Sequence, residues 1–175
     1  MKTKNVALVG LMVALICVVS PFTIPLPGLV PLSLSTFAVY LTAYLLGYKY
    51  GTLSVVIYII LGCIGLPVFS NFGSGFAKIA GPTGGYIVSY VLMAFILGIA
   101  LKLFGEKMLV AVIAMLLGTL VNYAMGTAWF MHVTSMSLAK SLALCVYPFI
   151  IGDVLKMALV LIVAPVVKKR ANLNY

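Results

Sequence analysis

Two charged residues interrupt the last apolar stretch of the chain. Asp153 and Lys156 lie in the run that begins at Tyr147, where most neighbours are apolar. A charge deep in lipid costs several kcal/mol, so such residues usually face an interior cavity and act there. Residues at i and i+3 share one face of a helix. The pair therefore predicts a recognition site in which the acid accepts hydrogen bonds from N–H donors and the amine binds an anionic oxygen. The same spacing also suits a self-contained ion pair that offsets its own burial.

The composition places these two residues in a membrane. Of the 175 residues, 65% are hydrophobic and 7% are charged, whereas soluble domains carry about 25% charged residues. Two acidic residues stand against eleven basic ones, which are scattered singly between apolar runs. These features exclude a water-soluble globule, a disordered chain and a nucleic-acid binder. We expect an integral membrane protein in contact with lipid, whose basic residues set its topology.

Six stretches are apolar and long enough to approach the roughly 20 residues that a membrane helix needs. They lie at about 5–24, 33–48, 50–66, 84–103, 108–130 and 141–167. One side of the membrane would then hold both termini and eight basic residues, namely Lys2, Lys4, Lys49, Lys102, Lys107, Lys168, Lys169 and Arg170. The opposite side would hold only Lys78 and Lys140. The positive-inside rule predicts cytoplasmic termini, so we expect an all-α integral membrane protein, one domain of six transmembrane helices over residues 1–175.

The two outer connections are predicted to fold over the helices. The first, 21–31, holds four prolines that force an extended path. The second, 66–83, holds a glycine cluster. Both are too apolar to be solvated tails, and non-helical backbone near a membrane is tolerated where it lines a cavity. We therefore expect a binding site that opens outward beneath these loops.

Short polar segments of the outer face add candidate binding residues. Gly84 and Gly85 follow Thr83 at the predicted start of the fourth span, where glycine lets backbone approach a ligand or simply makes a tight helix start. Asn71 both donates and accepts hydrogen bonds, although a turn residue is the alternative. Lys78 is an isolated charge that is either solvated or attracts an anionic ligand.

The first predicted span carries a stripe of small residues, Ala7, Gly10 and Ala14. Such a stripe lets another helix approach closely, either within this protein or in another subunit. The sequence offers no paired carboxylates, metal-binding cluster or nucleophile–base pair, so we predict neither an enzyme nor a cofactor or metal site. It also lacks a phosphate-binding loop of the GxxxxGK[ST] type, so any ATP-driven pumping needs a partner.

Three segments in this order resemble the BioY family of biotin transporter subunits: GLPVF at 65–69, GPTGGY at 81–86 and GD-x-x-K at 152–156. The resemblance covers nearly the whole chain. It implies a six-helix S component of an energy-coupling factor (ECF) vitamin transporter, with both termini cytoplasmic. It also implies a multi-pass protein of the cell membrane that binds biotin at the outer side for uptake. The implied partners are a transmembrane coupling subunit (T component), which the small-residue stripe would face, and two ABC-type ATPases. Some members of the family support uptake without a dedicated ATPase module.

The resemblance also assigns roles to individual residues. Asp153 would accept a hydrogen bond from the ureido group of biotin, and Asn71 would satisfy the ureido carbonyl or the other N–H. Lys156 would pair with the carboxylate, with Lys78 as a rival. Apolar walls would come from Phe69, Tyr86 and Trp129.

One position departs from the family pattern. Many members of the family carry a glutamine or asparagine near the start of the second span, where this chain reads Leu34-Ser35-Thr36. Ser35 or Thr36 would replace that amide only in part. Two alternatives stay open: an S component for a different vitamin, and a membrane scaffold subunit that binds no solute.

Overall fold

The computed structural model describes residues 3–24 and 30–172, most of which are helical. The helices are α1 (Thr3–Val19), α2 (Ser35–Cys63), α3 (Phe76–Ala80), α4 (Gly84–Phe104), α5 (Met108–Thr134), α6 (Leu138–Cys145) and α7 (Tyr147–Arg170). Two short strands, β1 (Thr23–Ile24) and β2 (Leu32–Ser33), pair antiparallel. A 3₁₀ turn, η1, covers Ser70–Phe72.

Within the described residues, four helical stretches are long and apolar enough to cross a membrane. These are Ser35–Cys63, Gly84–Phe104, Met108–Thr134 and Leu138–Arg170, and α1 is a shorter apolar helix. Many large apolar side chains face outward along them, as Ile151 does with 75% of its surface exposed. An apolar exterior suits a chain surrounded by lipid. The protein is therefore a helical, multi-pass membrane protein.

Helix α2 changes direction at Gly47, whose φ is 69° and ψ is −175°. A positive φ favours glycine, because it has no Cβ to clash with the backbone. The two halves of α2 stay close beyond this point: a Cβ added to Gly51 would lie 2.8 Å from the Cα of Ala43. The break falls in the tight turn expected between the second and third spans. The total of six membrane crossings and the side on which the termini lie stay predictions.

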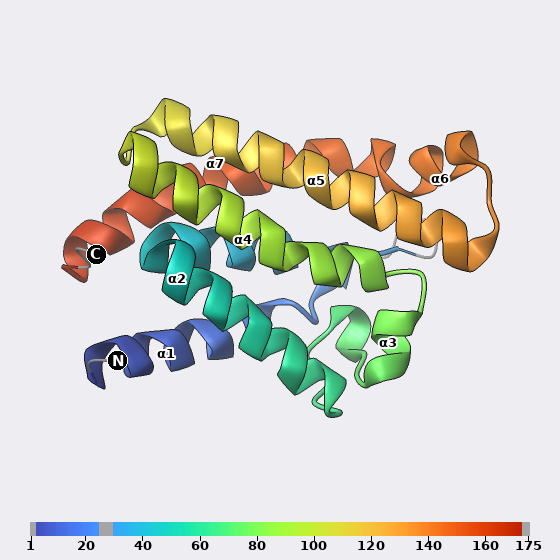
Figure 1. Ribbon diagram of the computed structural model, residues 1–175, viewed down its shortest axis with the longest axis horizontal. Coiled ribbons are helices and arrows are strands. Elements are labelled where there is room, and N and C mark those ends of the chain that lie inside the picture. The colour runs from blue at the N-terminus through green and yellow to red at the C-terminus, as the bar shows by residue number, and fades with distance from the viewer. Residues whose placement is uncertain (1–2, 25–29, 173–175) are drawn as a thin grey trace.

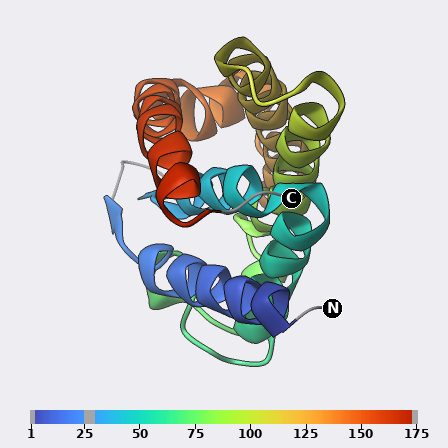
Figure 2. The same ribbon diagram turned by 90° about the vertical axis from the view of Figure 1, so that its left-hand side faces the viewer.

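The molecule has two distinct ends (Figure 1). Both termini and the α4–α5 connection lie at one end, which we call the terminal end. Helices α3 and α6 lie at the other, which we call the loop end. Figure 2 views the molecule from its terminal end. Helix α4 packs between α2 and α5, while α1 packs on α2, and α7 contacts α2 and α5.

Prolines explain where the predicted spans were wrong. Helix α1 ends at Val19 rather than near residue 24, because Pro21 cannot continue a helix and restricts the residue before it. The last predicted span is two helices separated at Val146, with Pro148 in the first turn of α7. The extended path expected for 21–31 is observed at β1, which pairs with β2 just beyond this segment, and residues 25–29 lie outside the described residues.

Candidate functional site

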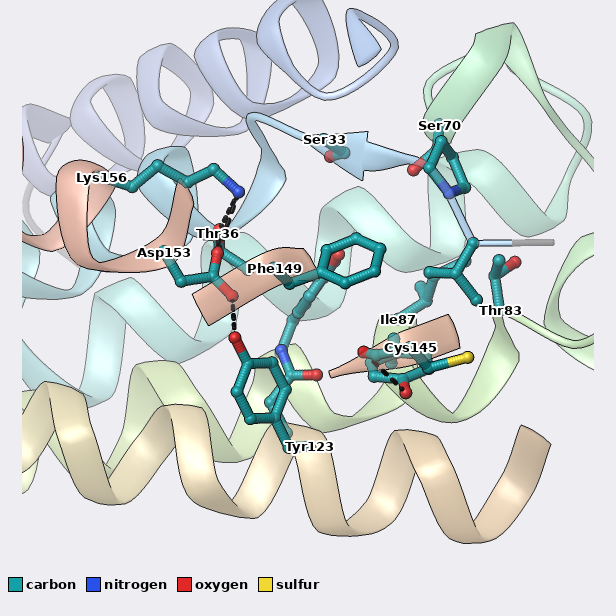
Figure 3. A pocket seen from close by; sticks show the side chains of 15 residues that line it. Ser33, Thr36, Ser70, Thr83, Ile87, Tyr123, Cys145, Phe149, Asp153 and Lys156 are labelled. Carbon is teal, nitrogen blue, oxygen red and sulfur yellow. Dashed lines mark hydrogen bonds and ion pairs between the residues drawn. The ribbon is translucent and has the colours of Figure 1, made fainter. Parts of the chain in front are cut away.

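A cavity lies at the loop end, between the helices and the two outer connections (Figure 3). Its volume is about 40 Å³. Its lining consists of Val30, Pro31, Ser33, Thr36, Ser70, Thr83, Tyr86, Ile87, Tyr90, Asn122, Tyr123, Cys145, Phe149, Asp153 and Lys156. Because the space is narrow, a ligand larger than water must push these side chains apart on entry.

Asp153 and Lys156 line this cavity from α7. Only 7% of Asp153 and 6% of Lys156 is exposed. Lys156 Nζ lies 2.9 Å from Asp153 Oδ1, as their i and i+3 spacing on the helix allows. Removing two charges from solvent costs several kcal/mol per ion unless further hydrogen bonds compensate them. The pair therefore needs polar partners from other helices.

Thr36 of α2 and Tyr123 of α5 supply those partners. Lys156 Nζ donates to Thr36 Oγ1 at 3.2 Å. Thr36 Oγ1 lies 3.3 Å from Asp153 Oδ1, to which it donates. Tyr123 donates its phenolic O–H to Asp153 Oδ2 at 2.5 Å. Both carboxylate oxygens thus accept hydrogen bonds, and three helices meet at one polar cluster.

Tyr86 of α4 forms another part of the wall. Its hydroxyl lies 3.1 Å from Thr127 Oγ1 and 3.5 Å from the carbonyl oxygen of Cys145. The ring packs on Gly126, where an added Cβ would lie only 2.2 Å from ring atoms. Its hydroxyl is therefore engaged by the protein, and the ring is held in the wall by α5.

Asn122 brings an unsatisfied polar atom to the cavity lining. Its side chain is almost fully buried, with 3% of the residue exposed. Nδ2 donates to the sulfur of Met93 at 2.8 Å, whereas Oδ1 has no hydrogen-bond partner among the described residues. A buried polar atom without a partner costs about 1–3 kcal/mol. A ligand donor would remove that cost.

Asn71 and Phe69, both predicted to contact the ligand, lie outside the cavity lining. Asn71 is exposed in η1 with a positive φ of 58°, and its Oδ1 accepts a hydrogen bond from Thr23. Phe69 is fully buried in the core. Its ring meets that of Tyr58 edge to face, with centroids 5.6 Å apart.

Lys78, Gly84 and Gly85 also lie outside the lining. Lys78 is half-buried in α3. A Cβ on Gly84 would lie 1.6 Å from the carbonyl oxygen of Ile79, and one on Gly85 would lie 2.3 Å from the Cβ of Trp129. The close approach expected at these glycines is therefore made by the protein's own chain. Trp129 itself donates to the carbonyl oxygen of Gly81 at 3.0 Å rather than lining the cavity.

The stripe of small residues on α1 is exposed. Ala7, Gly10 and Ala14 all face outward, and a Cβ on Gly10 would touch nothing within 4 Å. Val9 and Ile16 pack inward from the opposite face. Among the described residues, no other helix of this chain covers the stripe, so packing within the protein does not explain it.

Three polar residues of the cavity lining were not predicted as main ligand contacts. Thr36 was expected only as a partial substitute for an amide, and no ligand contact was predicted for Asn122 or Tyr123. Each of these residues has apolar residues three or four positions away in the sequence. That pattern is the same whether the polar side chain packs against another helix or binds a ligand. A polar residue surrounded by apolar ones on a predicted membrane helix was the available signal.

Fold and cavity together define a class: a multi-pass helical membrane protein with a cavity at its loop end that a buried ion pair lines. The model of the BioY family matches residues 1–173, so the chain belongs to that family. Membership in this family confirms the expected transport protein. It also agrees with the prediction that the chain is not an enzyme.

Named relatives agree with the family assignment. The chain is 41% identical over 164 residues to the probable biotin transporter BioY of Pyrococcus horikoshii, covering 94% of this chain and 96% of that one. It is 37% identical to the biotin transporter BioY of Thermotoga maritima, over 91% of this chain and 93% of that one. Its fold is similar to a crystal structure described as the S-component for biotin from an ECF-type ABC transporter, with a TM-score of 0.90 and 30% identity. That alignment covers 96% of this chain and 92% of the other.

Proposed function

We propose that this chain is the substrate-binding S component of an ECF-type transporter in the cell membrane. It binds biotin at the extracellular side, in the cavity at the loop end, for uptake into the cell. The observation that carries the proposal is the buried Asp153–Lys156 pair facing this cavity, with Tyr123 and Thr36 bonded to it. The names of the relatives support biotin as the solute.

In this proposal Asp153 and Lys156 both bind the same end of the ligand rather than its two opposite ends. Lys156 Nζ and Asp153 Oδ1 are 2.9 Å apart, whereas a fused ring and an alkyl chain separate the ureido group of biotin from its carboxylate. The ureido group has N–H donors on both sides of a carbonyl. Asp153 accepts from an N–H, and Lys156 donates to the carbonyl. This assignment replaces the expected pairing of Lys156 with the carboxylate.

The carboxylate then extends toward the far side of the cavity. Figure 3 shows Ser70 and Thr83 there, with Phe149 between them and the charged pair. The two hydroxyls are hydrogen-bond donors for a carboxylate. Thr83 directly precedes α4, whose N-terminal end favours negative charge. The rings of Phe149 and Tyr86 supply the apolar wall for the thioether ring and chain.

Transport requires further subunits in this proposal. The chain lacks a phosphate-binding loop, so a T component and two ABC-type ATPases supply the energy. The exposed stripe of Ala7, Gly10 and Ala14 suits close packing of a helix from the T component. Co-purification tests this step: Gly10→Leu should release the T component, and Leu11→Ala, beside the stripe, should not.

A scaffold role is the second candidate, because the two charges already satisfy each other at 2.9 Å. Radiolabelled biotin binding to the purified chain separates the two. Biotin should bind, and Asp153→Asn and Lys156→Met should each weaken binding. Glu106→Gln at the terminal end should not change it. An absence of saturable biotin binding would overturn the proposal, and competition by thiamin, riboflavin or pantothenate would assign another vitamin.

The assignment of ligand ends has its own test. Biotinamide keeps the ureido group and lacks the carboxylate charge. If Lys156 holds the ureido carbonyl, Lys156→Met should weaken biotin and biotinamide by the same factor. If Lys156 instead pairs with the carboxylate, the variant should weaken biotin strongly and biotinamide little, which would reverse the proposed orientation.

A further inference from the structure

A second cavity lies at the terminal end, far from the proposed biotin site. It is bounded by the turn of α2 at Gly47, by the end of α4 and by the end of α7. Its volume is about 490 Å³, against about 40 Å³ for the loop-end cavity. The proposed function uses none of its residues. We call it the basic cavity because Lys49, Lys102 and Lys168 line it.

The charges of the basic cavity do not cancel. Glu106 is its acidic lining residue and forms an ion pair with Lys168. Lys49 and Lys102 form no ion pair with a carboxylate in the described part of the chain. Three lysines against one glutamate leave an excess of two positive charges. A concave site with this excess selects an anion.

Tyrosine rings hold two of the lysines over the cavity. Lys102 Nζ lies 4.6 Å from the centre of the Tyr48 ring and donates to the Tyr48 hydroxyl at 3.4 Å. Lys168 Nζ lies 6.0 Å from the centre of the Tyr44 ring. Cation–π contacts of this kind orient an ammonium group without neutralising it. Ammonium and phenol groups together are donors suited to phosphate oxygens.

We infer from the length of α4 that the basic cavity lies near the lipid headgroups. Helix α4 has 21 residues, which span about 31 Å at 1.5 Å per residue, close to the thickness of the hydrocarbon core. Lys102 is in its last turn. Beside it, Leu103, Phe104 and Met108 expose 66%, 68% and 70% of their surface. Exposed apolar side chains therefore lie at the same end of the molecule as the cationic groups of the cavity.

We propose that the basic cavity binds the headgroup of an anionic phospholipid, with the phosphate on Lys49 and Lys102 and the acyl chains along the exposed apolar side chains of the same end. The combination of excess positive charge and exposed apolar side chains favours a lipid over free phosphate, which would gain nothing from the apolar side chains. It also favours a lipid over an acidic protein segment. Basic pockets at the ends of membrane helices bind anionic headgroups by this chemistry.

Native mass spectrometry of the purified full-length chain tests the proposal, with phosphatidylglycerol and phosphatidylcholine as probes. The chain should retain phosphatidylglycerol in preference to phosphatidylcholine. Each lysine near a surface of anionic lipid contributes about 1 kcal/mol, so Lys49→Gln with Lys102→Gln should weaken retention about thirtyfold. The matched control is Lys107→Gln with Lys169→Gln, which removes the same charge at the same end outside the cavity lining. Retention in the control should stay within about threefold of the parent.

Four outcomes would overturn the proposal. Equal losses in the two double variants would mean attraction to a charged surface rather than a site. Glycerol phosphate that displaces the lipid at equal concentration would mean a free phosphate site. Unselective retention by the parent would mean no anion site. Unchanged lipid retention in the cavity variant, with loss of the T component on co-purification, would mean a protein-binding site. Biotin binding should persist in both variants, which verifies folding.

Discussion

The two acidic residues of the chain both hold a lysine, at opposite ends of the molecule and in opposite surroundings. Asp153 and Lys156 have side chains that are 9% and 8% exposed, and α2 and α5 add hydrogen bonds to them. Glu106 at the terminal end is 47% exposed, and its partner Lys168 is 13% exposed. An exposed pair is worth about 0–1 kcal/mol, whereas a broken buried pair costs about 3–5 kcal/mol. Similar chemistry therefore has different consequences at the two ends.

The cost of burial explains the different roles that we assign. The chain has two acidic residues and buries one of them, Asp153, beside a cavity. Hydrogen bonds from three helices offset the cost of that burial. At the terminal end, Glu106 is paired with Lys168, so the nearby Lys49 and Lys102 have no carboxylate partner among the described residues. The loop end is thus suited to a neutral, dipolar group such as a ureido ring, and the terminal end to an anion.

The largest expected difference between the two pairs is in stability. Lys156→Met leaves the Asp153 carboxylate buried without its cation and should destabilise the protein by about 3–5 kcal/mol. Lys168→Met, the same change at the terminal end, should cost about 0–1 kcal/mol. Thermal unfolding of both variants in one detergent gives the comparison. Equal shifts would contradict the contrast between the two ends.

A smaller effect is expected from the hydroxyl that α5 contributes. Tyr123→Phe removes the donor to Asp153 Oδ2 and keeps the ring. A hydrogen bond to a charged group contributes about 1.5–3 kcal/mol, so biotin should bind about 10- to 100-fold more weakly. Tyr44→Phe at the terminal end is the control and should leave biotin affinity unchanged. Calorimetric titration with biotin measures the affinity of both variants. If Tyr123→Phe bound biotin as tightly as the parent, Tyr123 would not belong to the proposed site.

The bridging hydroxyl of α2 should matter less. Thr36 Oγ1 lies 3.2 Å from Lys156 Nζ and 3.3 Å from Asp153 Oδ1. Because these bonds are longer than the 2.5 Å bond of Tyr123, we expect them to contribute only as much as a typical hydrogen bond, about 0.5–1.5 kcal/mol. Thr36→Val should therefore lower biotin affinity about 2- to 10-fold. Thr42→Val is matched, because Thr42 is buried in the same helix and its hydroxyl donates to the Met12 sulfur at 3.8 Å, with no charged partner among the described residues. Equal losses in the two variants would indicate a general effect on α2.

The smallest effect is expected from salt on the exposed pair. Glu106→Gln should lower stability by at most about 1 kcal/mol at low ionic strength, and the difference should vanish near 1 M salt, where charges are screened beyond about 3 Å. The Lys156→Met deficit should persist at the same salt concentration, because buried charges are screened much less. Unfolding curves at low and high salt measure both. A salt-sensitive Lys156→Met deficit would show that the pair is reached by solvent.

Several features of the site were predictable from local patterns. The spacing of Asp153 and Lys156 put both on one helix face, and their apolar surroundings predicted a shared cavity, which the structure contains. The exposed face of α1 agrees with the stripe predicted at Ala7, Gly10 and Ala14. The turn at Gly47 was predictable because tyrosines, glycines and a lysine interrupt an apolar run there.

Other assignments depended on distances between remote segments. Gly84 and Gly85 were expected to admit a ligand, yet Ile79 and Trp129 occupy that space. Lys156 was expected to pair with the carboxylate end of the ligand, whereas we propose the ureido end because its Nζ lies 2.9 Å from Asp153 Oδ1. Local sequence shows that a glycine permits close approach but not which atoms approach it.

By itself, the sequence determined the apolar exterior, the helical segments, the breaks near proline and glycine, and the presence of an acid and an amine on one face. These follow from composition and from short periodic patterns, which act within a few residues. Only the tertiary structure decided that Thr36, Tyr123 and Asn122 surround that pair. They come from α2 and α5, at positions 30 to 120 residues away from the charges, and such meetings depend on how whole helices pack.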